Sequence, residues 1–415
     1  MIDRLQLANI GVFPALDLPL DPFTVLVGSN GAGKSTVLKA LELVTRWHSG
    51  GFEPKEVRKI RWRHLMPGDE GGFDVATSTE SAAMYAGASF DTLSVPRLSA
   101  DSWRAAVWAG GRELSVSRTG TALPEVLDAG RALTSVVNLR GRWDDTFREW
   151  DGVGESAGLD ADSPYWSQHL RYTPPKDPVV GRTLRLRLEH TAMAAPSLPE
   201  GERTSISPQG AGLASALAWM LGADREVIER IEADLARVVP QARHIRVLQA
   251  RVKRLGRKPF PVGDQVVTVP VEEEAIGHRL ELELKGAGRV PAELLSEGTL
   301  YALGLLTAIH GPDRPDLLLL DDLDRGLHLT GQVQLVRVIQ AIQEQSPHLQ
   351  VIATTHSPFQ LEGIAAGQVR VFGLRPNGTA NARRLSDHPE YERWAAALRT
   401  EELWANLGED WVVQE

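Results

Sequence analysis

The segment from Gly28 to Ser35 constrains this chain more than any other feature. Its letters, GSNGAGKS, match the pattern G-x-x-x-x-G-K-[ST] at every fixed position. An apolar run from Phe23 to Val27 precedes it, and a run with apolar residues at helical spacing follows, from Thr36 to Trp47. This strand–loop–helix context is the one in which the pattern cradles phosphates. The segment therefore predicts a phosphate-binding loop at a helix N-terminus, with an unliganded glycine-rich turn as the alternative.

Each residue type in this loop has a chemical reason. Glycines let backbone N–H groups turn toward phosphate oxygens, and the helix N-terminus favours negative charge. Lys34 is expected to reach the β- and γ-phosphates, and the Ser35 hydroxyl is expected to ligate Mg²⁺. The residues that we expect to contact a nucleotide here are Gly28, Asn30, Gly31, Ala32, Gly33, Lys34, Ser35 and Thr36.

A second motif lies far along the chain, where an apolar run from Leu317 to Leu320 is followed by Asp321 and Asp322. A buried strand of this kind delivers Asp321 to the mouth of an α/β sheet, where nucleotide sites lie. Asp321 is therefore expected to hold Mg²⁺, and Asp322 to orient a water toward the γ-phosphate. An acidic turn after a core strand would show the same letters, and the phosphate loop is what favours the metal site.

Two further segments flank the acidic strand. Leu295-Ser296-Glu297-Gly298-Thr299 precedes a helical pattern, and Ser296 also suits a helix N-cap. His356 follows another buried strand, Val351 to Thr354. A histidine at such a strand end can contact a γ-phosphate and report its presence, although a lone histidine there is more often structural. The order loop, pentapeptide, acidic strand and histidine favours the nucleotide-sensing role.

Taken together, these residues resemble the ABC-type AAA ATPases of the RecF/SMC/OLD class. The pentapeptide LSEGT resembles the LSGGQ signature of that superfamily. The resemblance implies an α/β fold: an ABC-type P-loop ATPase head with a mixed, largely parallel sheet, a β-rich N-terminal part and an α+β central insert. It also implies ATP and Mg²⁺ as cofactors and an ATP-dependent homodimer or higher oligomer. Ser296 and Gly298 of a second subunit would then complete the site, with catalytic roles for Asp322, Lys34 and His356.

The chain departs from the family pattern at the acidic pair. The family usually has Asp-Glu, whereas this chain has Asp321-Asp322, and Leu323 stands where proline is often found. Aspartate is one methylene shorter than glutamate, and a misplacement of about 1 Å can cost about 100-fold in rate. We therefore predict slow hydrolysis that the substitution Asp322→Glu would raise. Gln168 and Gln209 are the candidates for the family's Q-loop glutamine.

The order of predicted elements gives a domain division. Strands are expected at Ile2–Ile10, Val12–Leu20 and 114–117, helices at 212–221, 225–239, 296–309 and 331–345, and strands at 243–258 and 266–284. Glycine and proline interrupt residues 50–180, and 152–164 is expected to be a loop. We expect a head from residues 1–50 and 290–375, an insert at 51–200, a helical and β-strand segment at 201–289, and a C-terminal extension at 376–415.

Composition excludes several chemistries. The 415-residue chain has no cysteine, which excludes disulfides, cysteine–zinc sites and cysteine nucleophiles. Its net charge of -9 argues against a surface that binds nucleic acid everywhere, so a DNA contact would be a local patch. No apolar run approaches the ~18 residues of a membrane span. We therefore expect a cytoplasmic protein with no membrane contact.

Local patches exist at two basic runs and at the C-terminus. The runs comprise Arg58, Lys59, Arg61, Arg63 and His64 around Trp62, and Arg243, Arg246, Arg251, Lys253, Arg254, Arg257 and Lys258. Either run could contact DNA, although a solvated face is the favoured interpretation. Trp404 and Trp411 either anchor a partner or, as we favour, pack on the chain's own head.

The biological role is constrained less, and four roles stay open. About sixty residues follow Pro358, too few for an ordinary domain, and the insert has no heptads. The resemblance therefore implies a stand-alone bacterial form without a Toprim domain or coiled-coil arm. The first role is an ATP-driven switch for a separate effector protein, a nuclease in anti-phage defence. A RecF-like ATPase that clamps duplex DNA, a transporter's nucleotide subunit and a non-hydrolysing scaffold are the alternatives.

Overall fold

The computed structural model describes residues 1–48, 57–63, 72–77, 102–109, 112–119, 137–140, 181–199, 204–262 and 265–414. The chain divides into two compact units, each built from separate stretches of sequence. The phosphate-loop unit comprises Met1–Arg185, Asp316–Asp321 and Ser346–Glu415, and the signature unit comprises Leu186–Pro315 and Asp322–Gln345. The functional domain ranges given above stay predictions.

The phosphate-loop unit is organised by a six-stranded sheet in the order β16-β15-β3-β14-β13-β9. Strands β15, β3, β14 and β13 are parallel neighbours, and β16 is antiparallel to β15. Every residue of β3, β13 and β14 is buried, as expected for parallel strands covered on both faces. The strand bounds are Phe23–Gly28 (β3), Thr183–Leu186 (β9), Leu317–Leu320 (β13), Gln350–Thr354 (β14), Val369–Leu374 (β15) and Ala380–Arg384 (β16).

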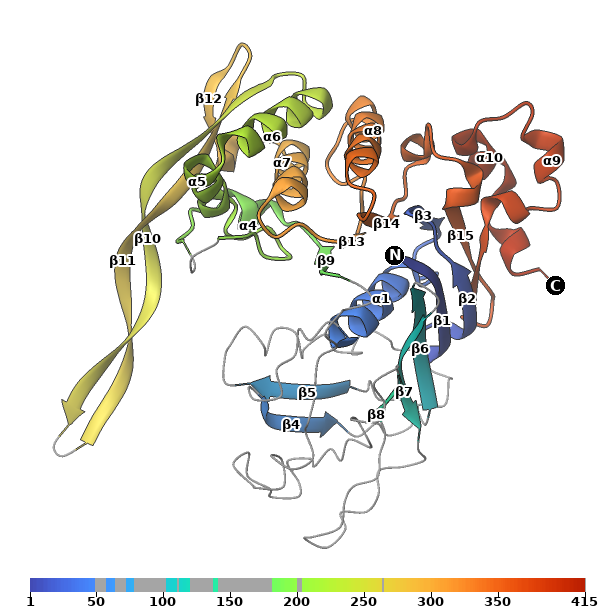
Figure 1. Ribbon diagram of the computed structural model, residues 1–415, viewed down its shortest axis with the longest axis horizontal. Coiled ribbons are helices and arrows are strands. Elements are labelled where there is room, and N and C mark those ends of the chain that lie inside the picture. The colour runs from blue at the N-terminus through green and yellow to red at the C-terminus, as the bar shows by residue number, and fades with distance from the viewer. Residues whose placement is uncertain are drawn as a thin grey trace, which may run out of the picture. The chain divides into compact units, whose positions relative to one another are not determined.

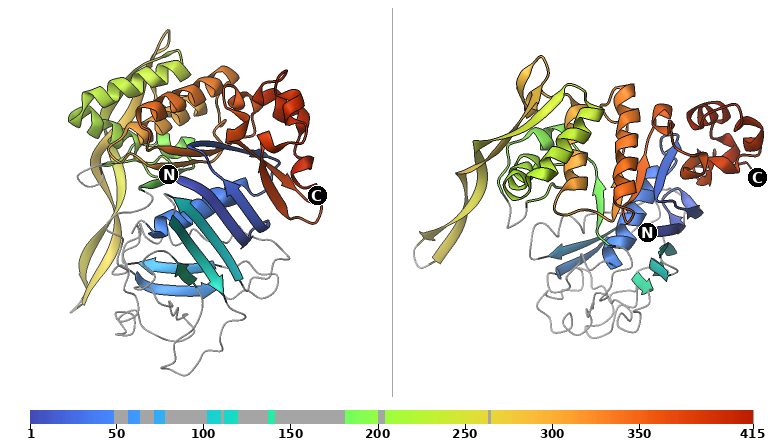
Figure 2. Two further views of the ribbon diagram at one scale, coloured as in Figure 1. Left: turned by 45° about the vertical axis from the view of Figure 1, so that its right-hand side comes forward. Right: turned by 45° about the horizontal axis from the view of Figure 1, so that its top comes forward.

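A second sheet in this unit has the order β2-β1-β6-β7-β8 and is antiparallel throughout. Its strands are Ile2–Ile10 (β1), Phe13–Pro19 (β2), Ser102–Ala109 (β6), Arg112–Thr119 (β7) and Val137–Arg140 (β8), and β4 (Val57–Arg63) and β5 (Gly72–Thr77) pair separately. Helix α1 (Lys34–His48) contacts β6 and β7 of this sheet and β3, β13 and β14 of the central sheet (Figures 1 and 2). The predicted β-rich N-terminal part is therefore confirmed.

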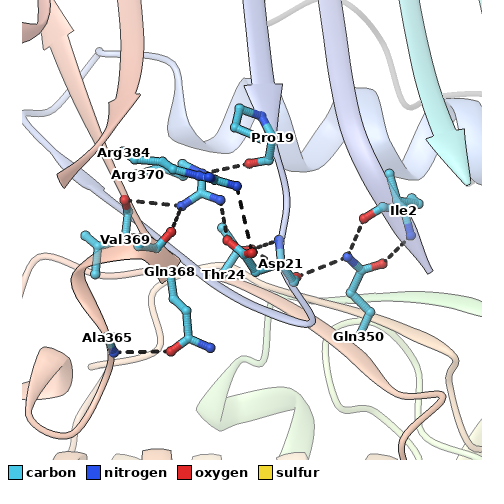
Figure 3. Close-up of polar contacts among 11 residues, drawn as sticks. Ile2, Pro19, Asp21, Thr24, Gln350, Ala365, Gln368, Val369, Arg370 and Arg384 are labelled. Atoms are coloured by element: carbon cyan, nitrogen blue, oxygen red, sulfur yellow. Dashed lines mark hydrogen bonds and ion pairs between the residues drawn. The ribbon is translucent and has the colours of Figure 1, made fainter. Parts of the chain in front are cut away.

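A buried polar cluster fixes the segment before the phosphate-loop strand (Figure 3). The Arg370 guanidinium is fully buried and donates to Pro19 O at 2.7 Å and to Asp21 Oδ2 at 2.5 Å. Burial lowers the pKa of Arg370, and the Asp21 carboxylate opposes that effect. The Gln350 side chain bonds both Ile2 N and Ile2 O at 2.7 Å. These contacts tie β15 to the residues that lead into β3, and they tie β1 to β14.

The C-terminal segment packs within the same unit. It forms η5 (Pro358–Leu361), η6 (Ala366–Gln368), η7 (Leu385–Asp387), α9 (Tyr391–Trp394), α10 (Thr400–Leu407) and η8 (Asp410–Val412). Trp404 and Trp411 are 9% and 7% exposed. The Trp411 indole N–H donates to Gly408 O at 3.1 Å, and its ring meets the His388 ring edge-on. The prediction that both tryptophans pack on their own head is confirmed.

The signature unit combines helices with a long β-ribbon. Its elements are α4 (His190–Ala194), α5 (Leu213–Ala223), α6 (Arg225–Val238), β10 (Ala242–Val262), β11 (Gln265–Leu284), β12 (Gly288–Pro291), η4 (Ala292–Leu294), α7 (Glu297–His310) and α8 (Leu329–Gln345). Helices α5 and α6 pack near the base of the ribbon, and its far end runs beyond them (Figure 1). The predicted helices and the two long strands are confirmed, with bounds that differ by a few residues.

Some predictions fall outside what the structure describes. Gln168 and the loop predicted at 152–164 lie outside the described residues, as do the side chains of the basic run at 58–64. Among the described residues, no helix is long and apolar enough to cross a membrane.

Candidate nucleotide site

The phosphate loop connects the end of β3 to the start of α1. Gly28 and Gly33 have φ values of 139° and 94°, in the region that favours glycine. A Cβ at Gly28 would lie 2.4 Å from Phe372 O, and one at Gly33 would lie 2.4 Å from the Phe13 ring. The two glycines are therefore required both by backbone conformation and by close packing against β15 and β2.

Lys34 is the first residue of α1 and is 6% exposed. Its Nζ donates to Gly28 O at 2.6 Å and to Ser29 O at 2.9 Å. The ammonium group therefore lies against the loop itself. A phosphate in the loop would offer this ammonium group charged acceptors in place of neutral carbonyls, and charge-assisted bonds are the stronger kind.

Asp321 lies directly after β13 and meets the loop helix. The Ser35 hydroxyl donates to Asp321 Oδ1 at 3.0 Å, and the Thr354 hydroxyl donates to the same oxygen at 3.2 Å. The fold thus brings together two residues 286 positions apart that the sequence predicted as metal ligands. Hydroxyl and carboxylate oxygens are the donors that Mg²⁺ prefers, so this pair fits the ion.

Arg185 also belongs to this cluster, and sequence reasoning missed it. It lies on β9, and its Nη2 is 2.9 Å from Asp321 Oδ2, while Nη1 is 3.3 Å from Glu42 Oε2 on α1. Only 14% of its side chain is exposed. No local pattern points to Arg185, because its partners lie 136 and 143 positions away in the chain.

Asp322 is exposed and has a φ of 58°. It is the one described residue other than glycine with positive φ. Aspartate and asparagine tolerate this left-handed conformation better than other side chains do. The backbone therefore gives a reason for aspartate at this position that is independent of any catalytic role.

His356 lies two residues beyond β14, at the carboxyl end of the sheet, where the phosphate loop follows β3. The register pairs Thr354 of β14 with Leu26 of β3, and Thr355 N donates to Leu26 O at 3.1 Å. The His356 side chain is exposed. The backbone arrangement thus agrees with the predicted position at a strand end beside the loop.

The predicted signature residues lie in the signature unit, at the start of α7. Ser296 is the N-cap of this helix and accepts a hydrogen bond from Thr299 N at 3.2 Å. Its side chain is exposed, whereas Gly298 is buried. The N-capping role that the sequence also suggested is present, and the contact to a second subunit stays a prediction.

Gly298 is required by close packing of two backbones. A Cβ there would lie 2.3 Å from Gly326 O, and Gly326 itself has a φ of 66°. Arg325 bonds Glu297 Oε1 at 2.7 Å and Leu188 O at 3.1 Å. These contacts hold the start of α7 against the turn that follows Asp322.

Part of the second basic run is neutralised within its own ribbon. Three arginines of β10 pair with glutamates of β11, namely Arg246 with Glu283, Arg251 with Glu274 and Arg254 with Glu273. The bond from Arg246 holds the pKa of Glu283 below its usual range.

Gln209, the second Q-loop candidate, accepts a hydrogen bond from Glu189 N through its backbone oxygen.

Comparisons with known proteins agree with this geometry. The family model described as "AAA domain, putative AbiEii toxin, Type IV TA system" matches residues 194–362, and a second AAA-domain model matches residues 4–79. An OLD nuclease of Thermus scotoductus (strain ATCC 700910 / SA-01) is 52% identical over 44 residues. That match covers 11% of this chain and 8% of the relative, so the chain spans less than a tenth of that curated protein.

One solved structure shows the fold, and a second is reported beside it. The head domain of an SMC protein bound to the C-winged helix domain of ScpA has a TM-score of 0.50 and 16% identity, over 94% of this chain and 99% of that one. An Smc head with an extended coiled coil from Pyrococcus furiosus has a TM-score of 0.47 and 14% identity, over 95% and 99%. The fold is that of a P-loop ATPase head.

Proposed function

We propose that this chain binds Mg-ATP between the phosphate loop and Asp321 and hydrolyses it slowly. Lys34 and the loop N–H groups would hold the phosphates, and Ser35 and Asp321 would hold the metal. Asp322, which follows Asp321 directly, would orient the attacking water, and His356 would sense the γ-phosphate. Mg²⁺ supplies charge neutralisation at the phosphates when it is bound.

One observation carries the proposal, the hydrogen bond between the Ser35 hydroxyl and Asp321 Oδ1 at 3.0 Å. Either motif could arise by itself as a glycine-rich turn or an acidic turn. Their meeting is not explained by either alternative, because nothing in the local sequence requires a hydroxyl at the helix start to contact a distant carboxylate. It is the arrangement that a metal bridging to nucleotide phosphates requires.

We further propose that ATP drives formation of a homodimer or higher oligomer. Ser296 and Gly298 of one copy would contact the γ-phosphate held by another copy. The exposed position of Ser296 at the start of α7 supports this part, since a buried residue would be unable to reach a second chain. The closed dimer would be the signalling state, and slow hydrolysis would set how long it lasts.

The proposed role is a cytoplasmic switch that controls a separate effector, a nuclease in anti-phage defence. The partial match to an OLD nuclease supports a link to nuclease action. In this proposal a partner protein supplies that action. The paired arginines of β10 count against the alternative of a RecF-like clamp that binds DNA through that run.

The proposal is tested by capture of the tagged protein from its native host with Mg-ATP, followed by mass spectrometry. The Lys34→Ala variant is the matched control, because it should fold but lose nucleotide. We expect a stoichiometric protein partner with a nuclease signature, retained by the native chain and lost by the control. Recovery of the protein alone, or with DNA only, would contradict the switch and support a self-contained DNA-clamping ATPase.

A further inference from the structure

An arginine lies where the proposed site needs negative charge. Strand β9 is the neighbour of β13 at the sheet edge, and it places Arg185 beside Asp321. The side chains of Arg185, Asp321 and Glu42 are 14%, 10% and 15% exposed. Charges with so little exposure interact more strongly than charges in water, so the arginine must change how the site attracts a cation.

The two oxygens of the Asp321 carboxylate are used differently. Oδ1 accepts hydrogen bonds from Ser35 and Thr354, whereas Oδ2 accepts from Arg185 at 2.9 Å. The arginine therefore fixes the plane of the carboxylate and directs Oδ1 toward the Ser35 hydroxyl. A metal ion at Ser35 would meet an acceptor that is already oriented.

The Arg185 Nε–H is buried and has no hydrogen-bond partner among the described residues. Buried donors without a partner cost free energy, so their presence calls for an explanation. The guanidinium donates from Nη1 and Nη2 to two carboxylates, and this leaves its Nε–H without a partner among the described residues. This is the arrangement expected if charge balance between Asp321 and Glu42 decides the position of the side chain.

Charge counting shows what the arginine does. Asp321 and Glu42 alone would give the cluster around Arg185 two negative charges, which would attract a divalent cation without any nucleotide. With Arg185 the cluster carries one net negative charge. We propose that Arg185 is a positioning residue and an internal counterion that makes Mg²⁺ binding depend on the phosphates of the nucleotide. The inference rests on the proposed function, because it concerns the same metal position.

A purely structural arginine would behave differently from an internal counterion. Removing the positive charge at Arg185 should strengthen the binding of a free divalent ion, whereas removing the negative charge at Glu42 should weaken it. Loss of packing would instead lower stability in both variants and would not move metal affinity in opposite directions. The sign of the change therefore separates the two roles.

The experiment measures Mn²⁺ binding by electron paramagnetic resonance, with and without ATP. The variants are Arg185→Met, Glu42→Gln and, as a matched control, Arg187→Met, which changes an exposed arginine two residues further on. Without nucleotide, we expect Arg185→Met to bind Mn²⁺ about tenfold more tightly than the native chain. Glu42→Gln should bind it more weakly than the native chain, and Arg187→Met should match it.

Arg185→Lys keeps the charge but loses the two-pronged geometry. It should retain the weak binding of free Mn²⁺ and lose affinity for Mn-ATP, because Asp321 is no longer oriented. Unchanged affinity for free Mn²⁺ in a folded Arg185→Met protein, when the native chain binds Mn-ATP, would overturn the inference alone. Failure of the native chain to bind Mn-ATP would instead overturn the proposed function.

Discussion

The two segments that are proposed to contact ATP are held in place by different kinds of contact. At the phosphate loop, the Lys34, Ser35 and Asp321 side chains are held chiefly by one another and by nearby polar groups. At the signature segment, Ser296 caps a helix and Gly298 packs against the Gly326 backbone. We therefore expect changes in the first set to cost less stability than changes in the second. The second set carries part of the structure of its own unit.

This difference determines how substitutions must be interpreted. A phosphate-loop variant that loses activity with an unchanged melting temperature has lost ATP binding or turnover. A signature variant that loses activity has lost its contact to ATP, the stability of its unit, or both. The variants below therefore pair each activity measurement with thermal unfolding, and they preserve the structural contact wherever the chain allows it.

The largest effect is expected from Asp322→Asn. Asparagine tolerates the left-handed backbone at φ 58° as well as aspartate does, so the fold should be kept. Loss of the group that orients the water should lower ATP turnover by about 100-fold or more while binding is kept. Steady-state phosphate release and nucleotide binding measure the two effects, with Asp324→Asn as control. Turnover at the native rate would exclude Asp322 from the chemistry.

The second-largest effect is expected from Lys34→Ala. It removes the cation that faces the phosphates, and bonds to charged groups of this kind correspond to about 100-fold in affinity. Isothermal titration with Mg-ATP measures the loss, and Lys39→Ala on the same helix is the control. Because Lys34 donates to carbonyl oxygens of the loop itself, the melting temperature should change little. Native affinity in the variant would contradict the assigned site.

Ser296→Asp tests whether the signature segment contacts a phosphate. Aspartate and asparagine both cap helices as well as serine does, so both variants should keep α7 stable. The negative charge of aspartate would face a γ-phosphate, whereas asparagine is neutral. We expect Ser296→Asp to lower ATP-dependent dimerisation by about tenfold or more, and Ser296→Asn to lower it less. Equal dimerisation by the two variants would argue against a contact to phosphate.

Gly298→Ala should show how much the close packing at Gly298 contributes to stability. The added methyl would lie 2.3 Å from Gly326 O, and such overpacking typically costs about 1–3 kcal/mol in the free energy of unfolding. Chemical denaturation measures that cost. Gly363→Ala, at a positive-φ glycine with open space, reports backbone strain alone. Native stability in Gly298→Ala would show that the close approach is relaxed in solution.

The smallest effect is expected from Asp322→Glu. The longer side chain should reach the attacking water better, but a left-handed backbone costs about 1–2 kcal/mol for residues that do not tolerate it. We therefore expect turnover to rise only a few-fold, at some expense of stability. An unchanged or lower rate would contradict the account of slow hydrolysis that rests on side-chain length.

The sequence predicts most of the architecture because its local patterns are strong. The apolar face of 225–239 ends at Pro240, and α6 spans Arg225–Val238; the apolar run 317–320 is β13. The helix expected from residue 331 begins at Leu329, where a turn precedes it and no apolar pattern marks the start. Boundaries of this kind depend on capping contacts more than on periodicity.

The parts that sequence reasoning missed depend on contacts between distant residues. Arg185 meets Asp321 across 136 positions, and Gly298 meets Gly326 through a backbone approach that no pattern marks. The left-handed backbone of Asp322 has only a weak local indication, an aspartate after a strand. Motif residues could therefore be named from the sequence, whereas the residues that position them could not.

The account's central claim is that ATP held at the phosphate loop brings two copies of this chain together. Sedimentation velocity of the Asp322→Asn variant with Mg-ATP tests it most directly, since this variant should bind ATP without consuming it. We predict a dimer or higher oligomer that disappears when ATP is removed and is absent in the double variant with Lys34→Ala. A species that stays monomeric while titration shows ATP bound would contradict the claim.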